Sequence, residues 1–583
     1  MPEATWRRRF RAPRVSLPAW ARDEPDRLLY SSNASGKWEL YMWDRKIHAH
    51  RQVTARPEGT MRGQLDPTGQ QIWWFDDHRG NEFGRWVVEP FTGGTPQMAV
   101  PDVPAAYGAG LAIGRSCAVV GTSTHEGTGI YLVPAGEASR PLYVHRESAW
   151  VSALSRDETL IAIGHSEHGD SRHPAVRILD LGGRPIREMW DGPGRGLLGT
   201  AWSPVAGDSR LLVEHERHEM PALLIWDVAT GDVSEVDTGL PGEVDAVWYP
   251  DAASLLLIHD HRGRTEMYRF DLASRALRRI EVDAGTVSQA RVRPDGEIWY
   301  AWTRSSVPPE IRANGGALLT PPGEPAPAGV AYSDHVVDGI HIFLAEPTAP
   351  RPHPLIFFIH GGPSAHDRDA FSAIVQAWVD HGFAVVMVNY RGSTGYGRAW
   401  RDALEGNPGF TELEDISKVR DWVVGSAIGD PRRVILSGRS WGGYLTLLGL
   451  GVQPERWSLG IAGVPVADYV AAYEDEMEPL KAFDRAIFTG SPEEIPEVYR
   501  ERSPITYVDR VRVPVLIIAG ENDPRCPIRQ IDNYLARLRD LNAPHQVYRY
   551  DAGHGSLVIE EMIRHVELEI AFAAKHLGTQ PPL

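Results

Sequence analysis

The chain has 583 residues, more than one hydrophobic core usually organises, so two domains are expected. Apolar residues make up 42% of it and charged residues 23%, a globular composition that excludes an intrinsically disordered chain. The formal net charge of −17 at pH 7 argues against nucleic acid and anionic membranes as main partners.

The cysteine content and the N-terminus bear on the compartment. Cys117 and Cys526 are the only cysteines, too few for a disulfide framework, and they predict reduced thiols in the cytoplasm. The basic stretch at residues 6–11 lacks the apolar segment of a secretory signal, so we interpret it as a solvated or docking segment. No run of about 18 apolar residues occurs, and no membrane span is expected.

From about residue 25 to residue 320 the sequence consists of short alternating strands separated by turns. A similar strand phrase recurs about every 45 residues, a spacing typical of β-propeller blades. It is found at residues 41–44, 86–89, 130–133, 176–180, 224–227 and 267–271. Residues 308–312 resemble a degenerate seventh copy, so we expect a propeller of seven blades. An irregular β-sandwich, the alternative, would not need such regular spacing.

After a proline-rich linker at residues 321–325 the rhythm changes to apolar runs alternating with helical patterns. This alternation predicts a parallel sheet covered by helices on both faces. The apolar runs are residues 355–359, 384–388, 434–436, 459–462 and 515–519, and two of the helices are expected at residues 415–424 and 529–541. We therefore expect an all-β propeller over residues 1–324 and an α/β-hydrolase domain over residues 325–583.

A Gly-x-Ser-x-Gly pattern occupies residues 438–442, between an apolar strand and a helix-compatible segment, with Ser440 at its centre. This is the pattern of a nucleophile elbow, in which a serine lies on a sharp strand-to-helix turn. A serine hydroxyl needs a base to take its proton, and the base needs an orienting carboxylate. In α/β-hydrolases these partners follow in the order serine, acid, histidine.

Two residues downstream fit this order. Asp523 follows an apolar strand and His554 follows the strand at residues 546–550, so both lie in loops at the carboxyl ends of strands, where α/β sheets place their sites. We predict Ser440 as the nucleophile, His554 as general base and then acid, and Asp523 as the orienting acid.

Four neighbouring residues are rivals for these roles. Glu521 and Asp551 lie nearby, but Asp551 precedes His554 too closely to take an independent position. His545 precedes a strand and His565 falls inside an apparent helix, so we interpret both as surface residues.

The oxyanion of a tetrahedral intermediate needs backbone donors. The residue after the nucleophile, Trp441, supplies one N–H group. The second is expected from the His-Gly-Gly-Pro loop at residues 360–363, where Gly362 is the predicted donor.

No metal and no cofactor are expected. The histidines of residues 215–218 lack the spacing of the His-Glu-x-x-His zinc motif, and no third ligand is visible beside them. Residues 259–261, His-Asp-His, are interpreted as a polar turn. A P-loop and a dinucleotide fingerprint are both absent from the sequence.

With a propeller followed by a hydrolase, the chain resembles the prolyl oligopeptidase family of serine peptidases, and most of all its acylaminoacyl-peptidase branch. The motifs that carry the resemblance are residues 360–363, 389–397, 438–444 and 523–527. The resemblance implies that Arg525 hydrogen-bonds a substrate carbonyl, and that the propeller caps the active site and admits only short peptides. Members commonly have Tyr after the nucleophile; Trp441 preserves the backbone donor but reshapes the pocket wall.

The acidic stretch at residues 473–478 follows the strand after the elbow. Glu474 and Glu476 there are candidates to hold a free α-amino group, which would favour an aminopeptidase; a solvated helix face is the alternative. The leading hypothesis is a serine peptidase that hydrolyses short peptides or aminoacyl or acylaminoacyl amides. An esterase or small-molecule amidase with the same triad and a propeller-based binding protein with an inactive hydrolase domain are the alternatives, and a homo-oligomer is left open.

Overall fold

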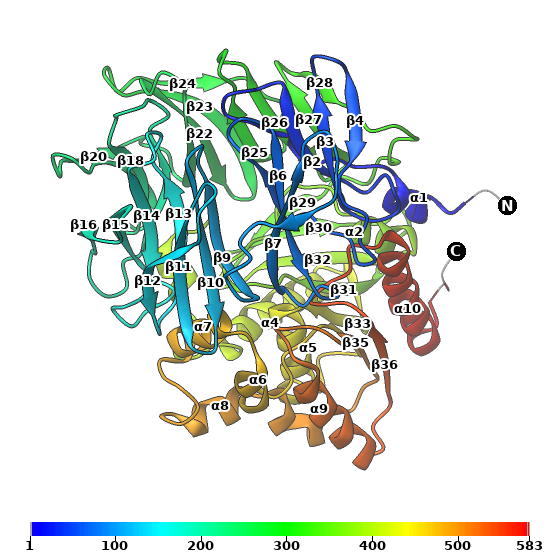
Figure 1. The fold of residues 1–583 in the computed structure, drawn as a ribbon. Helices are drawn as coiled ribbons and strands as arrows, with labels where there is room; N and C mark the ends of the chain where they lie inside the picture. The colour runs from blue at the N-terminus through cyan, green and yellow to red at the C-terminus, as the bar shows by residue number, and fades with distance from the viewer. Residues whose placement is uncertain (1–2, 580, 582–583) are drawn as a thin grey trace.

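The computed structural model describes residues 3–579 and residue 581. Strands β1 to β28 form a β-propeller, and strands β29 to β36 form one sheet with helices on both faces (Figure 1). Among the described helices, none combines the length and the apolar character needed to cross a membrane.

The propeller consists of five separate four-stranded sheets and one sheet of eight strands. The four-stranded sheets are β1–β4 (Ala19–Trp20, Arg27–Ser32, Glu39–Asp44, Ala49–Gln52), β13–β16 (Ala149–Leu154, Leu160–His165, Ala175–Asp180, Pro185–Met189), β17–β20 (Leu197–Trp202, Arg210–His215, Ala222–Asp227, Val233–Val236), β21–β24 (Glu243–Trp248, Ser254–His261, Arg264–Asp271, Leu277–Ile280) and β25–β28 (Thr286–Val292, Ile298–Arg304, Val307–Ala313, Gly316–Leu319). The eight-stranded sheet is β5–β12 (Gly63–Leu65, Gln71–Asp77, Phe83–Pro90, Gln97–Met98, Ala106–Ile113, Cys117–Thr124, Gly127–Pro134, Arg140–His145).

The structure confirms the propeller that the strand repeat of the sequence predicts. Its six plain copies fall in β3, β7, β11, β15, β19 and β23, each the third strand of a four-strand unit along the chain. The degenerate copy at residues 308–312 lies in β27. Within the ring, the sheet of β1–β4 packs on that of β25–β28, where the rings of Trp43 and Trp299 stack with centroids 6.4 Å apart.

The second half is built on a sheet with the strand order β29-β30-β32-β31-β33-β34-β35-β36. Its strands are Ser333–Val337, Ile340–Ala345, His353–Ile359, Ala384–Asn389, Gly429–Arg439, Leu459–Gly463, Val515–Gly520 and His545–Tyr550, numbered β29 to β36. Neighbouring strands run parallel from β32 to β36, whereas β29 and β30 add an antiparallel edge. All five apolar runs predicted from the sequence are strands of this sheet, which confirms the α/β-hydrolase assignment.

Alternate residues of the central strands face opposite layers of helices. Leu355 and Phe357 of β31 join the core under α4, α5 and α9, whereas Ile356 joins the core under α1, α2 and α10. The helices are α1 (Thr5–Arg11), α2 (Ala373–Asp380), α3 (Arg398–Asp402), α4 (Phe410–Gly425), α5 (Trp441–Val452), α6 (Tyr469–Asp475), α7 (Glu478–Phe488), α8 (Pro496–Arg502), the 3-10 helix η1 (Pro504–Arg510), α9 (Ile528–Asp540) and α10 (Ile559–Leu577).

The basic N-terminal stretch docks on the α/β half. Helix α1 lies beside α10 (Figure 1), with Trp6 and Phe10 buried in the same core as α2 and α10. The guanidinium of Arg9 pairs with Asp380 at 2.6 Å. Of the two interpretations made from the sequence, the docking segment is therefore the one observed.

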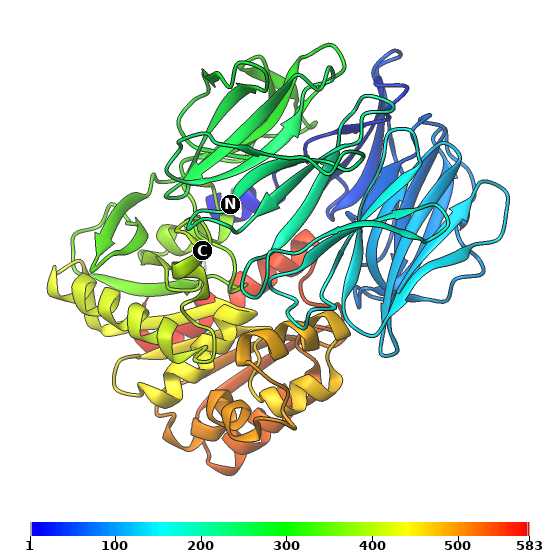
Figure 2. The same cartoon turned by 90° about the vertical axis from the view of Figure 1, so that its left-hand side faces the viewer.

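Between β34 and β35 the chain inserts helices α6 to α8. Figure 2 shows this segment, in orange, directly below the cyan strands of the propeller. Residues of α7 and of β9 and β13 line one shared cavity, so this insertion forms part of the interface between the two halves.

Candidate active site

Ser440 lies between β33 and α5, at the N-cap of the helix. Its backbone has φ 55° and ψ −120°, a conformation that costs a non-glycine residue energy and is concentrated at functional sites. The turn closes only because its neighbours are glycines. A Cβ on Gly442 would lie 2.0 Å from the carbonyl oxygen of Ile359, and one on Gly438 would lie 2.5 Å from the carbonyl carbon of Gly442.

Asp523 and His554 meet at the carboxyl ends of β35 and β36. The Nδ1–H of His554 donates to Asp523 Oδ2 at 2.8 Å. The other carboxylate oxygen, Oδ1, accepts the backbone N–H groups of Arg525 at 2.8 Å and Cys526 at 3.0 Å. Because the Asp523 side chain is fully buried and its oxygens have fixed partners, it sets the orientation and the tautomer of the imidazole.

Ser440 shares this edge of the sheet with the Asp523–His554 pair. Within the described residues, its hydroxyl makes no hydrogen bond to His554. Such contacts are commonly long before substrate binds and tighten in the substrate complex. The structure thus joins Asp523 to His554, and it places Ser440 at the same edge of the sheet, at the end of β33, with β34 between it and β35.

The loop after β31 passes next to Ser440. A Cβ on Gly361 would lie 3.4 Å from Ser440 Cβ and 3.0 Å from the Arg439 carbonyl oxygen. Gly362, with φ 128°, lines a cavity beside Ser364. The backbone of this loop therefore borders the space beside Ser440, where a donor for an oxyanion is needed.

A half-buried histidine stiffens this loop. His360 stacks on Tyr390 with ring centroids 4.3 Å apart, its Nε2 is 2.9 Å from Ser393 Oγ, and its Nδ1 is 2.8 Å from the Gly361 carbonyl oxygen. Burial lowers the pKa of His360 to about 4, so the ring stays neutral. A neutral ring donates once and accepts once, which matches these two partners.

Trp441 is buried under the elbow and is held by a carboxyl group that the sequence did not single out. Its Nε1–H donates to Glu412 Oε1 at 3.0 Å, and Glu412 Oε2 accepts the Gly409 N–H at 2.7 Å. Burial raises the pKa of Glu412 to about 7. The Trp441 ring also faces Phe483 of α7 at 6.3 Å, which makes it part of the wall next to the insertion.

Arg525 pairs with the propeller. Its Nε and Nη2 donate to the two carboxylate oxygens of Glu82 at 2.7 and 2.9 Å. Glu82 lies 443 positions earlier in the chain, so only the docking of the two halves brings it to the site. No local sequence signal marks Glu82.

Two propeller loops hold the segment that carries His554. Lys37 forms an antiparallel bridge with Val558. On the other side of the histidine, Gly553 packs so tightly that a Cβ would lie 1.9 Å from the Gly80 carbonyl oxygen. The histidine loop is thus part of the interface between the halves.

Two cavities lie between the propeller and the catalytic half. One, of about 600 Å³, is lined by Gly362, by Phe483 of α7 and by Trp150 of the propeller. The other, of about 580 Å³, is lined by His554, Arg525 and Glu82 among others. Both have the size of ordinary small-ligand sites.

The two acidic candidates for amine binding have other partners. Glu474 pairs with Arg529 at 2.6 Å. Glu476 is buried, and burial beside Asp484 raises its pKa well above the usual range. Both border a third cavity, of about 600 Å³, but neither side chain presents a free negative charge to it.

The rival residues lie elsewhere. Glu521 faces Arg549 at 3.5 Å, Asp551 forms an exposed pair with Arg79, and His545 Nδ1 is 2.8 Å from a backbone oxygen in its own turn. The interpretation of His565 as a surface residue is wrong, because it is 2% exposed. It lies on the inner face of α10, where an amphipathic helix buries whatever residue falls in its apolar stripe.

The α/β-hydrolase class is defined by an elbow serine, a hydrogen-bonded acid–histidine pair at the same edge of the sheet and a glycine loop beside the serine. Residues 369–580 match the sequence model of the prolyl oligopeptidase family. The catalytic half of the chain therefore carries a prolyl oligopeptidase family domain.

Known proteins are similar to this chain over different spans. The acylamino-acid-releasing enzyme of Rattus norvegicus is 26% identical over 344 residues, 53% of this chain and 47% of the relative. The dipeptidyl peptidase family member 6 of Caenorhabditis elegans is 31% identical over 239 residues, 40% of this chain and 32% of the relative. The chain thus spans less than half the length of these curated relatives. A crystal structure of a puromycin hydrolase superposes with a TM-score of 0.82 at 23% identity and covers 100% of this chain and 97% of its own, which shows a common fold.

Proposed function

We propose that the protein is a serine peptidase that hydrolyses short peptides or aminoacyl and acylaminoacyl amides. The observation that carries the proposal is the 2.8 Å hydrogen bond from His554 to the buried Asp523, beside an elbow that bears Ser440. The family domain over residues 369–580 supports it. So do the relatives, whose names describe release of acylated amino acids and dipeptides.

The reaction begins when Ser440 Oγ attacks the substrate carbonyl carbon and His554 Nε2 takes the hydroxyl proton. The imidazolium then forms next to the Asp523 carboxylate, which stabilises its positive charge. His554 returns the proton to the leaving amine as the carbon–nitrogen bond breaks, and an acyl-enzyme ester remains on Ser440. Water, deprotonated by His554, hydrolyses the ester and frees the serine.

The oxyanion accepts hydrogen bonds from the backbone N–H groups of Trp441 and Gly362. Loss of one such donor typically costs about 3 kcal/mol in barrier. The short contacts of Gly361 with the elbow and the neutral His360 behind it keep this loop in place. Donors that need no rearrangement during the reaction are the most effective ones.

Arg525 binds a substrate carbonyl in this proposal. Its Nε and Nη2 hold Glu82, so Nη1 is the nitrogen we assign to the substrate. Glu474 and Glu476 remain the candidates for a free amine, although the ion pair of the first and the buried site of the second give that role no support of its own.

The propeller limits access by size, because the cavities next to His554 and Gly362 are closed on one side by its loops. We infer seven blades by treating the eight-stranded sheet as two blades joined where β7 pairs with β9 through Phe83 and Gly84. We also propose a domain division near residue 324, and a cytoplasmic location in keeping with the buried free thiols of Cys117 and Cys526.

A substrate panel tests the proposal. Free and N-acetylated aminoacyl p-nitroanilides are compared with p-nitrophenyl esters, with Ser440→Ala as the inactive control. Turnover of free amines only assigns an aminopeptidase, and turnover of blocked ones assigns an acylaminoacyl-peptidase. Ester cleavage without amide cleavage would replace the peptidase with an esterase, and hydrolysis that survives in Ser440→Ala would refute the nucleophile.

A further inference from the structure

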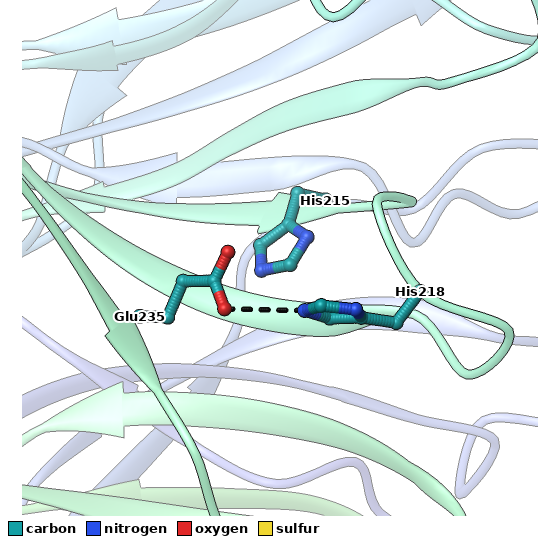
Figure 3. A group of neighbouring side chains, drawn as sticks. All are labelled: His215, His218 and Glu235. Atoms are coloured by element: carbon teal, nitrogen blue, oxygen red, sulfur yellow. Dashed lines mark hydrogen bonds and ion pairs between the residues drawn. The ribbon is translucent and has the colours of Figure 1, made fainter.

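Three propeller side chains outside the catalytic site converge on one point. His215 ends β18, His218 follows it in the loop, and Glu235 belongs to β20. Figure 3 shows the two imidazoles and the carboxylate directed toward one another. One ligand atom of each residue lies within 4.8 Å of the other two, and Glu235 Oε2 is 3.1 Å from His218 Nε2. The third ligand that the sequence pattern lacked is therefore present in the fold.

The inner histidine has an unused nitrogen. His215 is fully buried, and its Nε2 has no hydrogen-bond partner within the described part of the chain. Its Nδ1 accepts only a long hydrogen bond, 3.3 Å, from the Arg217 N–H. An unpaired buried polar atom is costly, and a bound ion would give this nitrogen a partner.

The neighbouring sheet provides an internal comparison. It carries the same arrangement in His165, His168 and Glu188, with His168 Nε2 at 3.0 Å from Glu188. There Arg177 stands opposite Glu188 across β15 and β16, and its guanidinium binds that carboxylate at 2.6 Å. A cation from the protein therefore already pairs with the carboxylate of this group, although His165 Nε2, like His215 Nε2, has no hydrogen-bond partner within the described residues.

In the second group the cross-strand cation is missing. The residue opposite Glu235 in β19 is Leu224, which has no charge. The guanidinium of Arg217 is 3.6 Å from the Glu235 carboxylate and is engaged by Asp191 at 2.7 Å. The carboxylate of Glu235 therefore faces the histidines with no strong cationic partner.

Two other groups of this kind are found among the described residues, and both are accounted for. Asp523, Cys526 and His554 belong to the catalytic site. Asp402 and Glu405 of the remaining group bind Arg172.

We propose that His215, His218 and Glu235 form a binding site for a divalent transition metal of the Zn²⁺ type. Two imidazoles and one carboxylate are ligands that suit this ion. Tetrahedral coordination at about 2.0–2.1 Å requires ligand atoms about 3.3 Å apart. The exposed side chains of His218 and Glu235 can close the small remaining gap.

The surroundings leave room for a fourth ligand. The three residues line a cavity of about 390 Å³, which admits water. A metal at His215 Nε2 takes the place of the proton on that nitrogen. The ring then carries its proton on Nδ1, at the expense of the long contact with the Arg217 N–H.

The loop that joins the two histidines also binds the catalytic half. Glu216 pairs with Arg401, and the Glu219 carbonyl oxygen accepts the Arg398 N–H at 2.7 Å. A metal that fixes both histidines therefore restrains the loop that carries these interface contacts. We expect metal binding to stabilise the docking of the propeller on the catalytic half.

The test is a calorimetric titration of the full chain with Zn²⁺ after treatment with a chelator. We expect one site in the wild type whose affinity falls at least about tenfold in His218→Ala and in the nearly isosteric Glu235→Gln. His168→Ala, at the equivalent position of the neighbouring sheet, is the matched control and keeps the wild-type affinity. Co²⁺ in place of Zn²⁺ is expected to give the absorption bands of a four-coordinate site in the wild type and in His168→Ala, but not in the two ligand variants.

Three results would overturn the inference: no Zn²⁺ binding by the wild type, binding that both ligand variants retain, or an equal loss in His168→Ala. Thermal unfolding of each variant without metal identifies a variant that has failed to fold. Because Glu235→Gln keeps size and shape, it remains informative if His218→Ala proves unstable.

Discussion

The role of Asp523 is tested most sharply by Asp523→Asn, because the structure dictates how the new amide must sit. Two backbone N–H groups, of Arg525 and Cys526, point at Oδ1 at 2.8 and 3.0 Å. An asparagine has one acceptor oxygen, and these two donors keep it on their side. Its NH₂ group is then left facing Nδ1 of His554.

This orientation moves the imidazole proton. A donor opposite Nδ1 requires Nδ1 to accept, so the proton resides on Nε2, the nitrogen that must take the proton of Ser440. A triad with the wrong tautomer loses about 10⁴-fold in kcat. Since each tenfold is 1.36 kcal/mol, the barrier rises by about 5.5 kcal/mol. KM and the unfolding free energy should change little, because the side chain keeps its shape and its backbone partners.

The assay measures kcat and KM on the preferred p-nitroanilide, with urea unfolding of the same preparations. Asp523→Ala is the comparison variant, because it also removes the acceptor of the two backbone N–H groups and should lose stability as well as activity. A kcat for Asp523→Asn within tenfold of the wild type would refute the reasoning, and the acid would then have to be sought elsewhere.

Three further predictions concern the surroundings of the triad. Arg525→Ala should lower kcat/KM at least about tenfold through a higher KM, since a charged hydrogen bond is worth about 1.5–3 kcal/mol. Glu82→Gln should lower kcat/KM less than Arg525→Ala does, and a larger loss in Glu82→Gln would contradict a role of Arg525 in substrate binding. Gly553→Ala should reduce kcat/KM about tenfold because its Cβ would lie 1.9 Å from a propeller carbonyl oxygen. Gly555→Ala, whose Cβ meets nothing within 4 Å, should leave kcat/KM nearly unchanged, and equal effects of the two substitutions would contradict the tight contact. Burial raises the pKa of Glu412 from 4.5 to about 7, so the folded state holds the proton more tightly than the unfolded state does. The free energy of unfolding should therefore fall by about 3 kcal/mol as the pH rises from 4.5 to 7. Urea titrations should show a shallower fall in Glu412→Gln, and the same dependence of the unfolding free energy on pH in both proteins would refute the assignment.

Local patterns in the sequence were sufficient to predict the parts of the site that depend on local geometry. The glycines around Ser440 predict the turn because no side chain fits at their positions. Asp523 and His554 each follow a strand of the sheet, and parallel strands end at one edge of a sheet, so their meeting was predictable. The propeller was predictable for a similar reason: its repeat recurs in one strand of each unit.

Features that depend on packing between distant segments were not predictable. Glu82 reaches Arg525 only because the two halves dock, and Glu235 meets His215 only through the register of β18, β19 and β20. His565 was misplaced because the buried stripe of α10 is set by the sheet on which it packs. The antiparallel edge formed by β29 and β30 was also missed, because short strands after a linker give a weak signal.

The most direct test of the central claim is covalent labelling of Ser440 by an organophosphorus reagent such as diisopropyl fluorophosphate. We predict one adduct, found by mass spectrometry on the peptide that contains Ser440, with complete loss of hydrolysis. Labelling should be greatly slowed in His554→Ala. An adduct on a different residue, or an equal labelling rate in His554→Ala, would contradict the account.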